Sequence, residues 1–327
     1  MRIGVVGLGN LGGAISNLIS KNNLNNKIYG FSIEKKVVLE VNKFHKNSKY
    51  LKGVVFKKNV IAISDLIELF EKCKVIFFCI PTKFIESNLN LVYEKIDLKN
   101  KIIVNCSKGL TEEGHLVSKM MKEKFGVRVI SMSGPSIANE FSKGYPAKVV
   151  LAAWNKKQER EMFKVKNLLV NDFFKVEISF DQVGVELGGV LKNIYAIGLG
   201  IIENEFNKSS KWFNFQGIYF TRVLVEMNDF ALAFGAKKDF IFNVSTIGDL
   251  IATSLSFESH HKKFGMGRAK CLNEGSCKKN YVEGEHTIKQ VLKIARKKKI
   301  KMPIANEIFR IIEGKKKSSA LVEVVLS

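Results

Sequence analysis

A lysine inside an apolar stretch is the residue of this sequence best suited to chemistry. Lys192 and Asn193 interrupt a mostly apolar, glycine-containing run from Val185 to Gly198. A buried lysine is costly unless it has a partner or a function, and burial lowers the pKa of an amine toward the range useful for proton transfer. Two interpretations stay open from these residues alone. Lys192 either transfers a proton, or it reaches solvent or an acidic partner.

Three further clusters combine polar side chains with small residues. Lys108 follows an apolar run that ends at residue 105, and ligands of α/β sheets bind at the carboxyl ends of strands. The other clusters are Ser133–Glu140, and Thr246–Leu250 followed by Ser259–Gly265. Each could also be ordinary turn or helix-capping chemistry. His260 and His261 are adjacent, so they do not share a helix face, and we expect no metal there.

The chain begins with a predicted strand that runs into a glycine turn, GLGNLG at residues 7–12. In such a turn Gly7 permits the sharp bend, Gly9 lets the backbone approach a pyrophosphate, and Gly12 lets the next helix pack on the strand. The start of that helix offers N–H groups and the positive end of a dipole to phosphates. The pattern indicates a dinucleotide site, and a glycine-rich turn without a ligand is the alternative.

The elements that must position these residues follow from the hydrophobic pattern. The first half alternates predicted strands with predicted helices, which favours βαβ units and a parallel sheet. Strands are predicted at 2–6, 27–31, 75–80, 101–105, 128–131 and 147–152, with helices at 12–21, 34–43 and 111–125. From about residue 181 only helices are predicted, at 182–203, 215–234, 246–254, 284–298 and 303–313. We therefore expect an α/β Rossmann-like dinucleotide-binding domain over 1–180 and an all-α substrate and catalytic domain over 181–327.

Composition narrows the classes of partner. No apolar run looks long enough for an integral membrane segment, and a strand that starts at residue 2 leaves no room for a leader, so we expect a cytoplasmic protein. The five cysteines show no metal spacing and are expected as reduced thiols. The net charge is +22, but the lysines are scattered and no nucleic-acid motif accompanies them. A lysine-rich surface that suits a small anionic substrate is the better interpretation, and no nucleic-acid partner is expected.

Taken together, these residues resemble the bacterial-type NAD(P)-dependent glycerol-3-phosphate dehydrogenases. The resemblance is collinear and covers essentially the whole chain. Besides the glycine turn, the shared segments are HKNSKYL at 45–51, IPT at 80–82, SKG at 107–109, SGPS at 133–136, VELGGVLKN at 185–193, the stretch 214–222, GDL at 248–250 and VEG at 282–284. The segment at 185–193 is the most specific of these.

The resemblance implies a reaction and a set of roles. Members reduce dihydroxyacetone phosphate reversibly to sn-glycerol 3-phosphate with NAD(P)H, which feeds phospholipid biosynthesis, and they are usually homodimers with substrate in the cleft between domains. By resemblance, Lys192 is the catalytic acid/base, Lys108 stabilises developing charge near substrate and cofactor, and Asp249 orients the lysine or a substrate hydroxyl. The remaining substrate contacts implied are Gly134, Ser136, Asn193, Ser259, His260 and His261. The implied cofactor contacts are Gly7, Gly9, Asn10, Leu11, Gly12, Lys108, Ala138, His260 and Glu283.

The sequence departs from the family at one point. Ser259-His260-His261 stands where members usually carry Ser-Arg-Asn, whose arginine and asparagine grip the substrate phosphate. A histidine cannot copy the bidentate fork of arginine, although it can donate to a phosphate, and Lys262 and Lys263 follow. The departure concerns the phosphate clamp and leaves the hydride chemistry in place.

Two other function classes remain from sequence alone. One is another two-domain dehydrogenase of small ketones or hydroxyacids, which would share the glycine turn, the helical domain and a lysine. The other is a non-catalytic binding homologue, for which the two histidines are the best support and the retention of Lys108 and Lys192 the best counter-argument.

For cofactor choice, residue 32 at the end of the second strand carries no acid, and Glu34, Lys35 and Lys36 follow. Use of both cofactors with a modest NADPH preference is expected, unless these three residues are only an exposed helix start.

Overall fold

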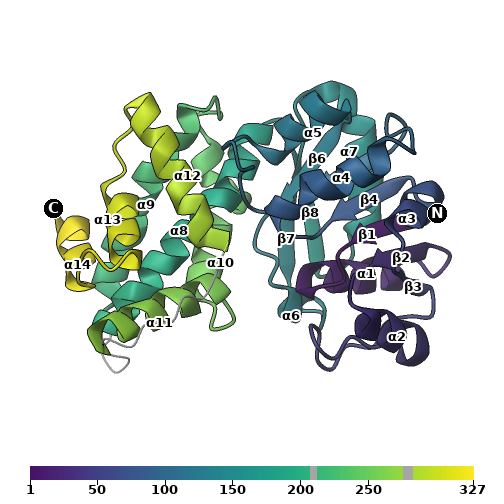
Figure 1. The fold of residues 1–327 in the computed structure, drawn as a ribbon, viewed down its shortest axis with the longest axis horizontal. Coiled ribbons are helices and arrows are strands. Elements are labelled where there is room, and N and C mark those ends of the chain that lie inside the picture. The colour runs from purple at the N-terminus through teal and green to yellow at the C-terminus, as the bar shows by residue number, and fades with distance from the viewer. Residues whose placement is uncertain (207–211, 275–282) are drawn as a thin grey trace. The chain divides into compact units, whose positions relative to one another are not determined.

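The chain forms two compact units in a computed structural model that describes residues 1–206, 212–274 and 283–327. The first unit comprises Met1–Thr111 and His115–Gln182, and the second comprises Glu112–Gly114 and Val183–Ser327 (Figure 1). The first unit is a sheet covered by helices and the second is helical throughout its described part. The predicted fold class, an α/β Rossmann-like domain followed by an all-α domain, is confirmed.

The first unit is built on an eight-stranded sheet in the order β3-β2-β1-β4-β5-β6-β7-β8. The strands are β1 (Arg2–Val6), β2 (Lys27–Phe31), β3 (Val60–Ile63), β4 (Val75–Phe78), β5 (Ile102–Asn105), β6 (Val129–Ser133), β7 (Ala147–Ala152) and β8 (Phe174–Ser179). The parallel sheet that the sequence predicts is correct from β3 to β6 but wrong at β6–β7, which pair antiparallel. The only helix between those two strands is the four-residue α6 (Ala138–Phe141), which is too short for a parallel crossover.

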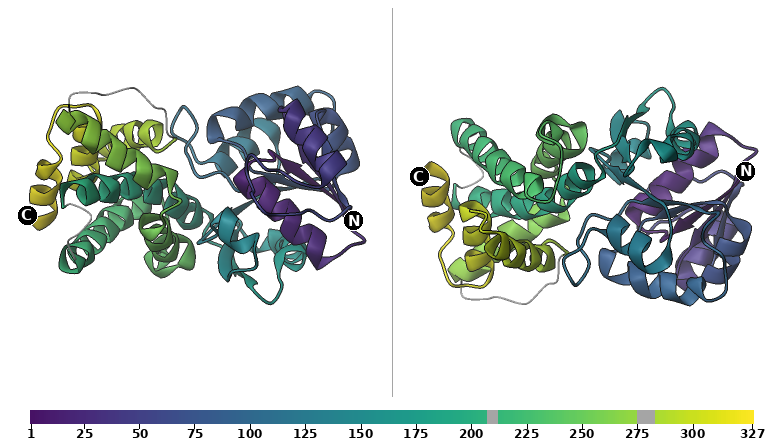
Figure 2. Two further views of the ribbon diagram at one scale, coloured as in Figure 1. Left: turned by 90° about the horizontal axis from the view of Figure 1, so that it is seen from below. Right: turned by 90° about the horizontal axis from the view of Figure 1, so that it is seen from above.

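Helices cover both faces of this sheet (Figure 2). One face packs against α1 (Asn10–Asn22), α2 (Lys35–Phe44) and α7 (Glu159–Leu169), and the other against α3 (Leu66–Lys72), α4 (Ile85–Tyr93) and α5 (Val117–Phe125). Short 3₁₀ turns occupy Thr82–Phe84 and Lys156–Gln158. The helix predicted at 111–125 begins only at Val117, because Gly114 has a φ of +82°, a left-handed conformation that a helix cannot contain.

The second unit is a helical bundle. Its helices are α8 (Gln182–Glu205), α9 (Phe213–Leu232), α10 (Asp249–Leu255), α11 (His260–Glu274), α12 (Glu283–Lys298), α13 (Pro303–Ile312) and α14 (Ser319–Leu326), with short turns η3 (Phe240–Phe242) and η4 (Val244–Gly248). Contrary to our expectation, one helix among the described residues, α8, is long and apolar enough to cross a membrane by length and composition. Its most apolar 18-residue window is 100% buried inside the unit, as expected for the core helix of a bundle.

Two contacts hold the bundle helices against α8. A Cβ on Gly200 of α8 would lie 2.1 Å from the carbonyl oxygen of Lys262, so the α8 and α11 backbones touch where they cross. The buried carboxylate of Glu226 on α9 accepts hydrogen bonds from Tyr195 on α8 and from the first N–H groups of α13.

The expectation of reduced thiols holds for Cys73, Cys79 and Cys106 but is wrong for Cys271, which is disulfide-bonded. The spacing of cysteines along the sequence can indicate a metal site, but it does not reveal a disulfide bond.

Candidate active site

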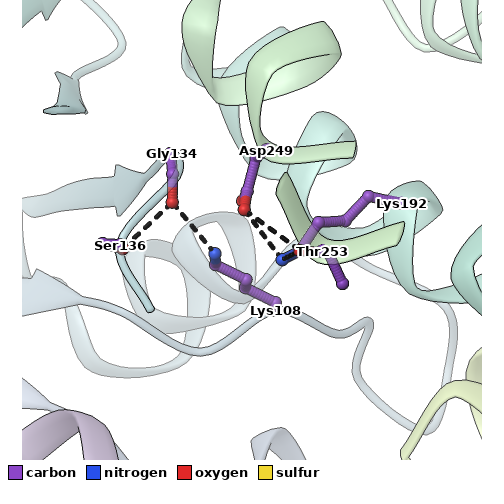
Figure 3. A network of polar contacts seen from close by, with 6 residues as sticks. All are labelled: Lys108, Gly134, Ser136, Lys192, Asp249 and Thr253. Carbon is purple, nitrogen blue, oxygen red and sulfur yellow. Dashed lines mark hydrogen bonds and ion pairs between the residues drawn. The ribbon is translucent and has the colours of Figure 1, made fainter. Parts of the chain in front are cut away.

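Lys192 lies inside the second unit and is almost fully buried. It is 6% exposed, and its Nζ donates to Asp249 Oδ1 at 2.8 Å and to Thr253 Oγ1 at 2.5 Å (Figure 3). Asp249 is itself 2% exposed. The buried lysine therefore has an acidic partner, as one of the two sequence interpretations held. An ammonium group that touches a carboxylate and a hydroxyl is also a suitable proton donor, because its direction is fixed and its charge is compensated.

The sequence places this cluster through two helices and a close contact. Asp249 is the first residue of α10 and Thr253 lies one turn later, so both side chains are on one face of that helix. The π-helical turn η4 leads into α10 and packs against α8 at Gly188. A Cβ on Gly188 would lie 2.6 Å from Thr246 Oγ1, so glycine is needed there. Asn193, the neighbour of Lys192, is 4% exposed.

Lys108 belongs to a second cluster, inside the first unit. It is half-buried in the loop after β5, and its Nζ lies 3.5 Å from the carbonyl oxygen of Gly134, which also accepts from Ser136 Oγ at 3.0 Å (Figure 3). Gly134 has a φ of +139°, and a Cβ there would lie 2.7 Å from the carbonyl oxygen of Lys148. The backbone at this turn is therefore restricted to glycine, and it follows β6 as Lys108 follows β5.

The three glycines of the first turn have different surroundings. Gly7 has a φ of +100°, and a Cβ on it would lie 2.6 Å from Ile80 Cγ2. A Cβ on Gly12 would lie 1.9 Å from the carbonyl oxygen of Gly7. A Cβ on Gly9 meets no protein atom within 4 Å, and α1 begins at Asn10, beside Leu11, without a side-chain cap. The packing of the protein itself thus requires glycine at positions 7 and 12 but not at position 9. The space at Gly9 is open, as it must be where the backbone approaches a phosphate.

Glu34 lies after β2, at the N-cap position of α2. Its carboxylate accepts from the ammonium group of Lys49 and from the hydroxyl of Tyr50, both in the loop after that helix. The hydrogen bond from Lys49, followed by that from Tyr50, lowers the pKa of Glu34. The residue is therefore neither part of the helix nor an isolated acid, because two side chains already occupy its carboxylate.

The predicted phosphate clamp lies at the start of α11. Ser259 Oγ accepts from the backbone N–H of Lys262 at 3.3 Å, His260 is exposed, and the ring of His261 packs against Gly284 of α12. Lys262 is 5% exposed and forms an ion pair of 2.7 Å with Glu203 on α8. Ala138 begins α6 in the first unit, and the side chain of Glu283, a predicted cofactor contact, lies outside the described residues.

Sequence reasoning missed two residues that contact the predicted ones. Thr253 holds Lys192 together with Asp249, and its position four residues after that acid is the signal that could have found it. Glu203 pairs with Lys262, and no sequence pattern indicates that contact because the two residues lie on different helices, far apart along the chain.

Comparison with known proteins follows the same division of the chain. The sequence model of the NAD-dependent glycerol-3-phosphate dehydrogenase N-terminus matches residues 2–159, and that of the C-terminus of the same family matches residues 181–323. This chain belongs to the NAD-dependent glycerol-3-phosphate dehydrogenase family. Glycerol-3-phosphate dehydrogenase [NAD(P)+] of Fusobacterium nucleatum is 30% identical over 100% of this chain and 97% of its own length. The Thermotoga sp. protein of that name is 32% identical over 96% and 94%.

Solved structures agree with this family assignment. Glycerol-3-phosphate dehydrogenase of Coxiella burnetii is 25% identical, has a TM-score of 0.88, and covers 100% of this chain and 98% of its own. A D-mandelate dehydrogenase has a TM-score of 0.64 at 13% identity, and a putative 2-dehydropantoate 2-reductase of Enterococcus faecalis has 0.56 at 12%. These two share the fold alone, so the comparisons favour the family over the hydroxyacid alternative.

Proposed function

We propose that this protein transfers a hydride reversibly between NAD(P)H and dihydroxyacetone phosphate, with sn-glycerol 3-phosphate as the reduced product. The observation that carries the proposal is the buried contact of Lys192 with Asp249 and Thr253. A binding protein gains nothing from a desolvated ammonium group, whereas a ketone reductase needs a positioned proton donor. Both halves of the chain match the family in which that reaction occurs.

In this mechanism Lys192 protonates the ketone oxygen while the adjacent carbon accepts the hydride, and it takes the proton back in the reverse reaction. Asp249 accepts a hydrogen bond from the Lys192 ammonium group, stabilises its charge and turns its Nζ in one direction. Thr253 adds a second fixed contact. Lys108 acts on the same substrate by stabilising the negative charge that develops on its oxygen.

The cofactor supplies the hydride when it is bound to residues 1–180. Gly9, Asn10 and Leu11 fit the pyrophosphate, because no side chain caps α1 and a Cβ at Gly9 meets no protein atom within 4 Å. Gly7 and Gly12 shape that turn. Ala138, Lys108, His260 and Glu283 are the further cofactor contacts that we propose by family resemblance.

The substrate is held mainly by residues 181–327. We assign the phosphate to the start of α11, where Ser259 precedes the helix and His260 and His261 are its first two residues, at the positive end of the helix dipole. Asn193 lies next to the proton donor and is proposed to contact a substrate hydroxyl. From the first unit, Gly134 and Ser136 complete the set of substrate contacts, as the family resemblance implies.

The biological setting follows from the product. sn-Glycerol 3-phosphate is the backbone on which glycerophospholipids are built, so we place the enzyme in phospholipid biosynthesis. A cytoplasmic homodimer without nucleic-acid partners agrees with the scattered lysines and with the burial of α8, the one helix in the described part of the chain that is long and apolar enough to cross a membrane.

A substrate panel tests the proposal. The oxidation of NADPH and NADH by the full chain is followed with dihydroxyacetone phosphate, with dihydroxyacetone and with a 2-oxo acid such as ketopantoate. We expect turnover with dihydroxyacetone phosphate and at least about a hundredfold lower kcat/KM without the phosphate, because a charge-assisted clamp is lost. Turnover with the 2-oxo acid alone would establish the hydroxyacid alternative, and the absence of any turnover would favour a binding homologue.

A further inference from the structure

The helix α9 has an apolar stripe on the side that faces away from its own bundle. Phe215, Tyr219, Val223, Met227 and Phe230 form its buried face. On the opposite side Ile218, Val225 and Leu232 are 41%, 56% and 37% exposed. These three residues recur at seven-residue intervals, which is about 10.5 Å along a helix, so they form a straight row. A row of this kind is typical of a helix that packs against another helix.

The charges of α9 differ from those of the rest of the chain. The whole protein has 53 lysines and arginines in 327 residues, yet α9 contains no lysine and a single arginine, Arg222. Lysine is depleted in the buried parts of protein interfaces, whereas arginine is enriched there. An exposed surface that is apolar and free of lysine, on so basic a protein, therefore has the composition of an interface.

We propose that this stripe packs against the same stripe of a second copy of the chain, antiparallel, about a two-fold axis at Val225. With that axis Val225 faces Val225 of the second copy and Ile218 faces Leu232, because both lie seven residues from the centre. An isologous contact requires such self-complementarity, since the same patch serves both partners.

The charged residues beside the stripe are complementary under the same symmetry. Arg222 and Asp229 are both exposed and lie on the same side of the stripe, three residues before and four residues after Val225. The two-fold axis places Arg222 of one copy within one position of Asp229 of the other, and it does so twice. This arrangement favours a second copy over an unrelated protein, which has no reason to match it, and over a membrane surface, which attracts helices rich in lysine.

The contact extends beyond α9. A stable dimer buries about 800 Å² on each partner, more than one pair of short helices provides. Phe242 is 80% exposed on η3, which packs against α9, so η3 offers further apolar surface near that helix. The interface that we propose therefore comprises α9 and η3.

The inference rests on the proposed homodimer and names its contact surface, so the test measures mass and not activity. Sedimentation equilibrium of the full chain should give twice 36.8 kDa for the wild type. Val225→Glu puts two carboxylates on the axis and should raise the dissociation constant at least about a hundredfold. Val55→Glu is the matched control, because Val55 is also 56% exposed but lies in the first unit, and it should remain a dimer.

A charge exchange makes the test specific. Asp229→Arg should weaken the dimer, and adding Arg222→Asp in the same chain should restore it, because the two charges exchange places. A monomeric wild type would overturn both the homodimer and its surface. A dimer that survives Val225→Glu, or that the double variant fails to restore, would retain the homodimer and overturn the α9 surface. Neither result bears on the reductase activity, which the substrate panel tests separately.

Discussion

The two lysines assigned to the reaction have opposite surroundings. Lys192 is 6% exposed and its Nζ is fixed by a carboxylate at 2.8 Å and a hydroxyl at 2.5 Å. Lys108 is half-buried in a loop, and the contact of its Nζ with the Gly134 carbonyl oxygen is 3.5 Å long. The charge of Lys192 is desolvated and fixed in position, whereas the charge of Lys108 is held more loosely and keeps access to water.

This difference suggests a division of work. Proton transfer needs a donor at hydrogen-bond distance with a fixed direction, which the Asp249 and Thr253 contacts provide for Lys192. Stabilising a developing charge tolerates a looser position, because Coulomb attraction falls only slowly with distance. The predictions below separate the two roles.

The largest effect is expected from Lys192→Ala. Loss of a general acid lowers kcat by about 10²–10⁴-fold, while NADPH binding stays close to that of the wild type because alanine preserves the helix. Steady-state kinetics and a cofactor titration measure the two quantities. Lys289→Ala, which removes an ion-paired lysine from α12, is the control and should leave kcat unchanged. Near wild-type turnover of Lys192→Ala would refute its assignment.

A smaller loss is expected from Lys108→Ala. Removing one group that stabilises developing charge costs about 10²-fold in kcat, and water can replace part of a half-buried charge. Raising the ionic strength should lower the turnover of the wild type more than that of this variant, since salt screens an accessible charge. An equal salt response of both proteins would contradict the assigned role.

The histidines at the start of α11 predict an effect of several-fold on substrate affinity. His260→Arg supplies a bidentate, permanently charged fork that a histidine cannot copy, so its KM for dihydroxyacetone phosphate should be lower than that of the wild type. Steady-state kinetics at saturating NADPH measure the two KM values. An unchanged KM for dihydroxyacetone phosphate would show that the side chain at position 260 does not contact the phosphate.

Cofactor choice should be less than tenfold selective. Lys49 and Tyr50 occupy the Glu34 carboxylate, so it is a poor acceptor for the ribose of NADH, and we expect both cofactors to work with a modest preference for NADPH. Lys49→Ala should shift the kcat/KM ratio toward NADH, and Lys72→Ala, which breaks a comparable surface pair, should not. A wild-type preference for NADH above about tenfold, or roughly 1.4 kcal/mol, would contradict this account.

Glu226 predicts an effect on stability alone. Burial raises its pKa from 4.5 to about 7, against the hydrogen bonds from Ile304 and Ala305. The carboxyl group of Glu226 thus binds a proton more tightly in the folded protein than in the unfolded chain. This difference stabilises the folded protein fully below about pH 4.5, and the stabilisation is lost as the pH rises through about 7. The unfolding free energy of the wild type relative to Glu226→Gln should therefore fall from pH 5 to pH 8. A constant difference would mean that Glu226 does not titrate there.

The sequence predicted several strands of the first unit and the segments that carry family motifs. β1, β2 and β7 begin and end at the predicted residues, and the family resemblance is confirmed. β3 was missed because its apolar run, VIAI, has only four residues, and β8 was missed because Lys175 and Glu177 interrupt its apolar residues. A helix starting near Ser259 was expected, but its extent was not predicted, because the polar start HHKK and two glycines give no clear apolar pattern in a helix that α8 contacts.

The site shows the same limit. The residue pattern placed Lys192 on an apolar helix but left its partner open, and only the family resemblance pointed to Asp249, which lies 57 residues away along the chain. Only folding brings such groups together, and no spacing rule connects them. Likewise, Lys262 was expected near the phosphate, and its ion pair with Glu203 follows from the crossing of α8 and α11.

Chemical rescue of Lys192→Ala tests the central claim most directly. Ethylamine added to this variant supplies the missing ammonium group, so turnover with dihydroxyacetone phosphate should rise with the concentration of ethylammonium and should fall when the pH is raised above the pKa of the amine. Lys108→Ala serves as the comparison and should lack this dependence on the protonated amine. Rescue of Lys108→Ala but not of Lys192→Ala, or rescue by the neutral amine alone, would contradict the assignment of Lys192 as the proton donor.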